Sequence, residues 1–271
     1  MRRVLFLAAI VGGCGRPAQD PAMKFAFAAY GDCRKYDEVH TDIAKSMVAA
    51  GPKFVLVTGD LVDFGDNEAM IERWRAITKD LRAASEYVCA RGDHDGEKLV
   101  ILRRELKMEK LFYDRVFGDI HVFVLDSCQK FAEAEQLKWL EETATASTSK
   151  HKIAVFHHSP FLIYENRMEQ AAEIRAAIHP VLVRLKFCAA MCGHQHAFYT
   201  TVRDGVRYVV TAGGGAPLAG IDASLGAPGD LARRMYHWVG FNEESGKING
   251  TVVDRYGQKV PELGFTLCEH K

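Results

Sequence analysis

The chain has 271 residues, of which 48% are hydrophobic, and its 35 basic residues balance 35 acidic ones. A formal net charge of zero argues against the strongly basic surface of a nucleic-acid-binding domain. The length and the apolar content favour one large domain with a substantial core.

The N-terminus has the pattern of an export signal. Arg2 and Arg3 precede an apolar stretch, 4–11, that is too short to span a bilayer as a helix. Val11-Gly12-Gly13-Cys14 resembles a bacterial lipoprotein box, in which the cysteine becomes the lipidated first residue of the mature protein. An ordinary secretory signal that is cleaved nearby is the alternative.

We therefore expect a signal peptide at 1–13, a tether at 14–22 and a catalytic domain at 23–271. The expected location is the bacterial cell envelope, where the exported protein faces the periplasm or the exterior. The lipid on Cys14 would attach it to the membrane. An exported protein can carry disulfides, but most of the other cysteines lie in apolar runs and are predicted to be small core residues.

Apolar, strand-like runs alternate with helical segments, which predicts βαβ units and an α/β fold. Helices are expected at 39–50, around Met70 to Leu81, and at 98–106, 133–143 and 169–185. Pro180 should end or kink the last of these. Three later runs, 208–211, 236–241 and 248–253, are typical of antiparallel strands. Gly213-Gly214-Gly215 is interpreted as a tight turn or as a loop near the site.

Five apolar runs end in aspartate or histidine. In open α/β sheets, ligands bind beyond the carboxyl ends of the strands, so these side chains could gather into one metal site. His194 and His196 are two residues apart and would face the same side of a strand. The five endings are Gly31-Asp32, Gly59-Asp60-Leu61-Val62-Asp63, Gly92-Asp93-His94-Asp95, His157-His158-Ser159-Pro160 and Gly193-His194-Gln195-His196.

The order of these motifs resembles the calcineurin-like metallophosphoesterase superfamily across about residues 24–260. The resemblance implies two mixed β-sheets packed face to face and flanked by helices. It also implies two divalent metal ions, of Mn, Fe, Zn or Mg, with Asp60 as the carboxylate that bridges them. The metal ligands that it implies are Asp32, Asp60, Asp93, His158, His194 and His196.

The resemblance gives His94 a catalytic role as the acid that protonates the leaving group, oriented by Asp95. Asp63 is expected to support the site or to cap the next helix. His158 is preferred to His157 because it aligns with the His-x-Pro motif of the family. Strand alternation should also keep two neighbours from facing the same site.

Two positions depart from the family pattern. Arg34 stands where the family has a metal-binding histidine, and Asp93 stands where it has asparagine. A guanidinium cannot be a metal ligand. Arg34 could instead grip a substrate phosphate, could pair with Asp93, or could with it replace a metal ion. Purple acid phosphatases, a related branch, also lack this histidine, but they place a tyrosine at the position of Asp63.

The sequence thus predicts a metal-dependent phosphoesterase that hydrolyses a small phosphate monoester or diester at a binuclear metal centre. The alternative is a lipoprotein without catalysis that binds metal or phosphate on a degenerate phosphoesterase scaffold.

Overall fold

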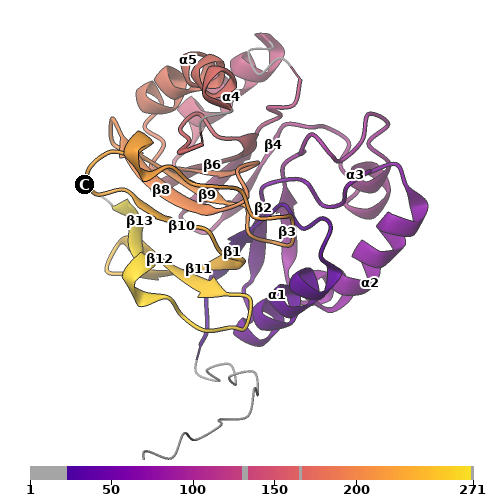
Figure 1. The fold of residues 1–271 in the computed structure, drawn as a ribbon. Helices are drawn as coiled ribbons and strands as arrows, with labels where there is room; N and C mark the ends of the chain where they lie inside the picture. Colours follow the sequence, from indigo (N-terminus) through magenta and orange to yellow (C-terminus); the bar gives the residue numbers. More distant parts are fainter. Residues whose placement is uncertain (1–22, 130–133, 165–166, 270–271) are drawn as a thin grey trace, which may run out of the picture.

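The computed structural model describes residues 23–129, 134–164 and 167–269. Within these residues, two mixed β-sheets pack face to face, and helices cover both outer faces (Figure 1). The predicted architecture is confirmed. The expected signal peptide and the tether that includes Cys14 lie outside the described residues.

The first sheet has six strands in the described residues, in the order β13-β12-β11-β1-β2-β3. The strands β1, β2 and β3 run parallel, and β11, β12 and β13 are antiparallel to their neighbours. The bounds of these strands are β1 Phe27–Tyr30, β2 Phe54–Val57, β3 Glu86–Cys89, β11 His237–Glu244, β12 Lys247–Asp254 and β13 Phe265–Glu269.

The second sheet has seven strands in the same part of the chain, in the order β10-β8-β9-β7-β6-β5-β4. Its centre, from β5 through β6 and β7 to β9, is parallel. The run 208–211, predicted to be an antiparallel strand, is antiparallel to β8 and parallel to β7 in the second sheet, whereas the two later runs pair antiparallel with each other in the first sheet. The bounds are β4 Tyr113–Phe117, β5 Ile120–Val124, β6 His151–His158, β7 Ala189–Gly193, β8 Phe198–Arg203, β9 Val206–Thr211 and β10 Leu231–Arg233.

The helices lie where the apolar spacing predicts them. α1 (Asp37–Ala50), α2 (Glu68–Ala84) and α3 (Val100–Glu105) cover the first sheet, and α4 (Ala134–Ala146) and α5 (Met168–Arg184) cover the second (Figure 1). The helix α5 does not end at Pro180. Ile178 and Leu182, on either side of the proline, are fully buried. Burial of this face outweighs the loss of one helical hydrogen bond. None of the described helices is long and apolar enough to cross a membrane.

Three layers of buried side chains hold the sheets and helices together. Phe27 and Leu56 of the first sheet meet Val122 and Val155 of the second between the sheets. Alternate residues of the same strands pack outward against the helices. Strands that are buried on both faces need continuous apolar runs, which is the pattern in the sequence. Two short 3₁₀ helices of the described residues, Ala223–Leu225 and Pro261–Leu263, lie in loops.

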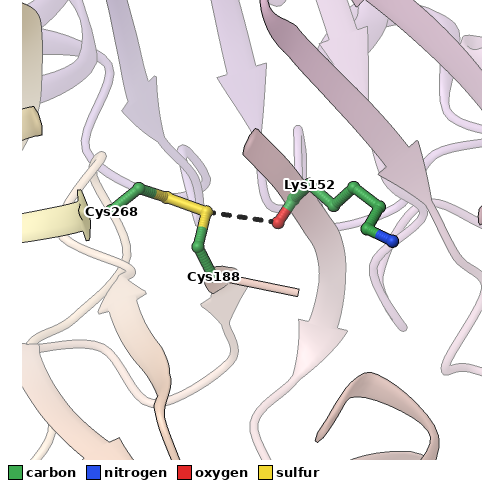
Figure 2. The surroundings of a disulfide bond; sticks show 3 residues. All are labelled: Lys152, Cys188 and Cys268. Carbon is green, nitrogen blue, oxygen red and sulfur yellow. Dashed lines mark hydrogen bonds between the residues drawn. A yellow bond between two sulfur atoms is a disulfide. The ribbon is translucent and has the colours of Figure 1, made fainter. Parts of the chain in front are cut away.

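A disulfide joins the two sheets. Cys188, just before β7, is bonded to Cys268 of β13, with the two Cα atoms 5.2 Å apart (Figure 2). The carbonyl oxygen of Lys152 lies 3.4 Å from the Cys188 sulfur. Cys268 lies in the core between the sheets and Cys188 packs against it, as expected of small core residues, but the two are joined by a disulfide and are not free thiols. The sequence does not predict this pairing, because the two cysteines are 80 residues apart along the chain.

We expect the Cys188→Ser/Cys268→Ser double variant to unfold more easily than the wild type. The bond closes a loop of 80 residues, and cross-links of such loops typically contribute about 3–5 kcal/mol, in part by restricting the unfolded chain. Denaturant unfolding with and without a reductant measures the difference. Reductant should weaken the wild type and leave the double variant unchanged. Cys128→Ser, which removes a free thiol, should keep the sensitivity to reductant; a wild type indifferent to reductant would contradict the pairing.

Candidate metal centre

The predicted site residues lie together at the carboxyl ends of parallel strands from both sheets. Asp32, Asp60 and His194 follow β1, β2 and β7, and all three have left-handed backbone angles, with φ of 56°, 56° and 69°. Residues other than glycine rarely adopt such angles, and strain of this kind concentrates at functional sites. The unusual angles turn three side chains toward a common point.

Close backbone packing fixes these turns. A Cβ at Gly92 would lie 2.2 Å from the backbone nitrogen of Asp60, so only glycine fits there. The run Gly213-Gly214-Gly215 packs beneath the Asp32 loop, where Gly214 donates to the Gly31 carbonyl (2.9 Å) and Ala216 donates to that of Asp32 (2.8 Å). These glycines therefore position Asp32 by close packing.

Four residues form a candidate metal-binding group, named here the four-donor group: Asp93, His157, His158 and His194. One possible ligand atom from each lies within 4.8 Å of the others, and the three histidines are buried. The Asp60 Oδ1 atom lies 3.6 Å from His157 Nε2, so Asp60 borders the same space. Nitrogen and oxygen donors in this mixture suit Zn, Fe or Mn.

The hydrogen bonds of His157 indicate that a positive charge belongs in this group. Its Nδ1–H donates to the Thr58 carbonyl oxygen (2.7 Å), which leaves Nε2 facing the Asp93 Oδ1 atom at 2.9 Å. Two acceptors at this distance need a proton or a cation between them. Burial disfavours the charged ring, but the charges of Asp60 and Asp93 outweigh burial and raise the pKa of His157 to about 10. The residues therefore fit a divalent ion.

His158 and His157 both face this group, so the expectation that only one of them does is wrong. The pairing of β6 with β7 shifts register between Val155 and His158, which breaks the strict alternation of a strand. The Ser127 Oγ atom lies 3.0 Å from His158 Nδ1 and orients the ring. Burial lowers the pKa of His158 to about 2, so its ring stays neutral. Ser127 was not predicted, although it follows β5 as the other site residues follow their strands.

A second group, named here the three-donor group, consists of Asp32, Asp60 and His196. The Arg34 side chain enters it: Nε donates to Asp60 Oδ2 at 3.2 Å, and Nη2 lies 3.4 Å from His196 Nε2. Nη1 donates to Asp63 Oδ1 at 2.9 Å. A cation therefore already stands among these donors, and the group does not fit a divalent ion while Arg34 keeps this position.

The suggested pairing of Arg34 with Asp93 is not the one that the structure shows. Arg34 pairs with Asp60 and Asp63, whereas Asp93 lies 2.9 Å from His157 Nε2 and 3.2 Å from His194 Nδ1. Burial opposes ionisation of Asp93, but the two histidines outweigh it and hold the pKa of the carboxyl well below its usual range. The two departures from the family pattern thus act on different groups of donors.

His94 lies beside both groups, and its surroundings correct the role expected for Asp95. The Nδ1–H of His94 donates to the Asp63 carbonyl oxygen (2.9 Å), and its backbone N–H donates to Asp60 Oδ1 (3.0 Å). Asp95 instead accepts from the backbone nitrogens of Asp60 and Leu61. Burial, with the nearby Asp60, raises the pKa of the Asp95 carboxyl to about 7. Asp95 therefore holds the Asp60 turn, and the Asp63 carbonyl orients His94.

A family model described as calcineurin-like phosphoesterase matches residues 25–198. No curated protein matches the chain by sequence. Among solved structures, purple acid phosphatase PPD1 from yellow lupin (Lupinus luteus) seeds is similar, with a TM-score of 0.79 and 16% identity. That match covers 90% of this chain but only 53% of the lupin chain.

Two further structures share the fold. GAP50, the anchor in the inner membrane complex of Plasmodium, has a TM-score of 0.70 and 13% identity, and the match covers 90% of this chain and 89% of that one. A dimetal phosphatase from Danio rerio has a TM-score of 0.58 and 11% identity, with coverage of 91% and 99%. Identities this low show the fold alone, whereas the family model covers residues 25–198, a range that contains all five strand endings. The chain therefore belongs to the calcineurin-like phosphoesterase family.

Proposed function

We propose that the chain hydrolyses a small phosphate monoester or diester at the strand-end site that contains the four-donor group. The observation that carries this proposal is the convergence of three buried histidines with the carboxylates of Asp60 and Asp93, whose negative charges favour a cation beside His157. Asp60, Asp93, His157, His158 and His194 would hold a divalent ion there. When bound, such an ion supplies charge for the phosphoryl oxygens and an acidified water.

The chain's own residues contribute position and proton transfer. His94, whose Nδ1 is held by the Asp63 carbonyl, has its other ring nitrogen free to carry a proton to the departing oxygen. Arg34 is 12% exposed at its side chain and adds a fixed positive charge beside Asp60. A second ion, as the resemblance implies, would require the three-donor group to accept it as well.

Activity measured beside elemental analysis tests this function. Protein stripped by a chelator and reloaded with Mn, Fe, Zn or Mg should hydrolyse p-nitrophenyl phosphate, its bis-ester, or both, and the preference distinguishes a monoesterase from a diesterase. Failure to hydrolyse either compound, in protein that holds its metal, would favour the alternative of a binding protein without catalysis.

We also propose that the protein is exported and anchored to a bacterial membrane through a lipid on Cys14. The disulfide between Cys188 and Cys268 supports export, because disulfides persist in oxidising compartments.

Cys14→Ser should release the protein from the membrane fraction and keep its hydrolytic activity, because the anchor would lie outside the folded domain. Fractionation of cells followed by mass spectrometry of the mature N-terminus measures this. An unmodified N-terminus downstream of Cys14 in the wild type would show plain secretion instead.

A further inference from the structure

We propose that the guanidinium of Arg34 takes the place of one of the two metal ions typical of this family, so that the chain binds one divalent ion beside a built-in cation. The inference rests on the proposed function, since it concerns the same site. It assigns Arg34 to the three-donor group and leaves the four-donor group to the metal.

The position of the guanidinium carries the proposal. Its three nitrogens point to three different side chains: Nε to Asp60 Oδ2 (3.2 Å), Nη1 to Asp63 Oδ1 (2.9 Å) and Nη2 to His196 Nε2 (3.4 Å). Two of these partners, Asp60 and His196, belong to the three-donor group. A metal ion there would need the His196 nitrogen lone pair that Arg34 already faces, and it would have to share the Asp60 carboxylate with the guanidinium.

The tautomer of His196 agrees with this arrangement. Its Nδ1–H donates to the carbonyl oxygen of Pro217 at 2.8 Å. In the neutral ring, Nε2 is then an acceptor, and the guanidinium of Arg34 can donate to it. The same Nε2 lies 3.4 Å from Asp32 Oδ1. Arg34 therefore uses the nitrogen that would otherwise bind a metal.

Asp60 divides its two oxygens between the groups. Oδ2 accepts from Arg34, while Oδ1 lies 3.6 Å from His157 Nε2, on the side of the four-donor group. The Asp60 carboxylate, which the family resemblance places between two metal ions, therefore lies between the guanidinium of Arg34 and the four-donor group that would hold one ion.

Asp63 fixes Arg34 in this position. It accepts from Arg34 on one oxygen and pairs with Lys35 Nζ on the other at 2.9 Å. Its side chain is only 9% exposed. Asp63 thus anchors the guanidinium from behind, and arginine keeps its charge at any accessible pH. The arrangement is a stable substitute for an ion that could dissociate.

The number of metal ions per chain tests the proposal. The wild type, Arg34→His and Arg255→His are stripped with a chelator, dialysed against excess Mn²⁺ and analysed for bound manganese. Arg255 is a matched control because it is a partly buried arginine, 18% exposed, that pairs with Asp42 at 2.7 Å away from the donors. Thermal unfolding confirms that each variant folds, and the EPR spectrum separates isolated Mn²⁺ from coupled pairs.

We expect one manganese ion in the wild type and in Arg255→His, and two in Arg34→His, where an imidazole replaces the guanidinium. Two coupled ions in the wild type would overturn the proposal, as would an Arg34→His chain that gains no ion over the wild type. The difference in bound manganese between Arg34→His and the wild type tests the role of Arg34. The manganese bound by the wild type tests the proposed function separately. A wild type that binds no ion would contradict the metal centre, even if Arg34→His bound one.

Discussion

Asp60→Asn is expected to release most of the bound metal and to lower turnover by about 10²–10³-fold. Asp60 is 1% exposed and touches both donor groups. An amide lacks the charge that the ion and Arg34 both need, and it replaces one of the two acceptor oxygens with a donor. Loss even of a residue that supports a ligand typically costs about 10–100-fold in metal affinity, and removal of one charge-stabilising group costs about 10²–10³-fold in turnover.

Metal titration and steady-state kinetics on the same preparations measure these effects. Asp230→Asn is the matched control, since Asp230 is also a carboxylate 9% exposed and paired with an arginine, Arg203, but belongs to neither donor group. That variant should keep its metal. If Asp60→Asn retained full metal content and wild-type turnover, the site would have to lie elsewhere.

The strand endings made the location of the site predictable from sequence. Parallel strands place their carboxyl ends at one edge, so the aspartates and histidines after β1, β2, β3, β6 and β7 had to lie near one another once the sheets formed. The same rule would have found Ser127, because the apolar run of β5 also ends in polar residues, Asp126 and Ser127. The Ser127 hydroxyl is not among the usual protein ligands of Zn, Fe or Mn, so a search for metal ligands does not select it.

The sequence pattern does not predict the individual side-chain contacts of the site. Strand alternation predicts that His157 faces away from the site, but alternation fails where a register shift interrupts β6. The partners of Arg34 depend on which way a long side chain turns, and sequence spacing does not fix that direction. The pairing of Cys188 with Cys268 depends on the contact between two sheets, and local sequence carries no record of it.

His94→Ala is expected to keep the metal content of the wild type and to lower the rate on alkyl phosphates by about 10²–10⁴-fold, the usual range for general acid–base catalysis. The substitution removes the ring but keeps the backbone N–H that donates to Asp60 Oδ1, so the carboxylate should stay in place. The aryl oxide that leaves from an aryl phosphate such as p-nitrophenyl phosphate is a weak base and needs less protonation. Hydrolysis of aryl phosphates should fall much less.

The ratio of the two rates separates an acid from a structural residue. His179→Ala is a suitable control, because that ring is also partly buried and hydrogen-bonded, to Tyr208 and Asp204, but contacts neither donor group. It should change neither rate. His94 lies within 4.8 Å of possible ligand atoms of Asp60 and Asp93, so loss of metal from His94→Ala would make it a ligand. An equal loss on alkyl and aryl substrates with metal retained would mean that His94 positions the Asp60 and Asp63 turn and donates no proton.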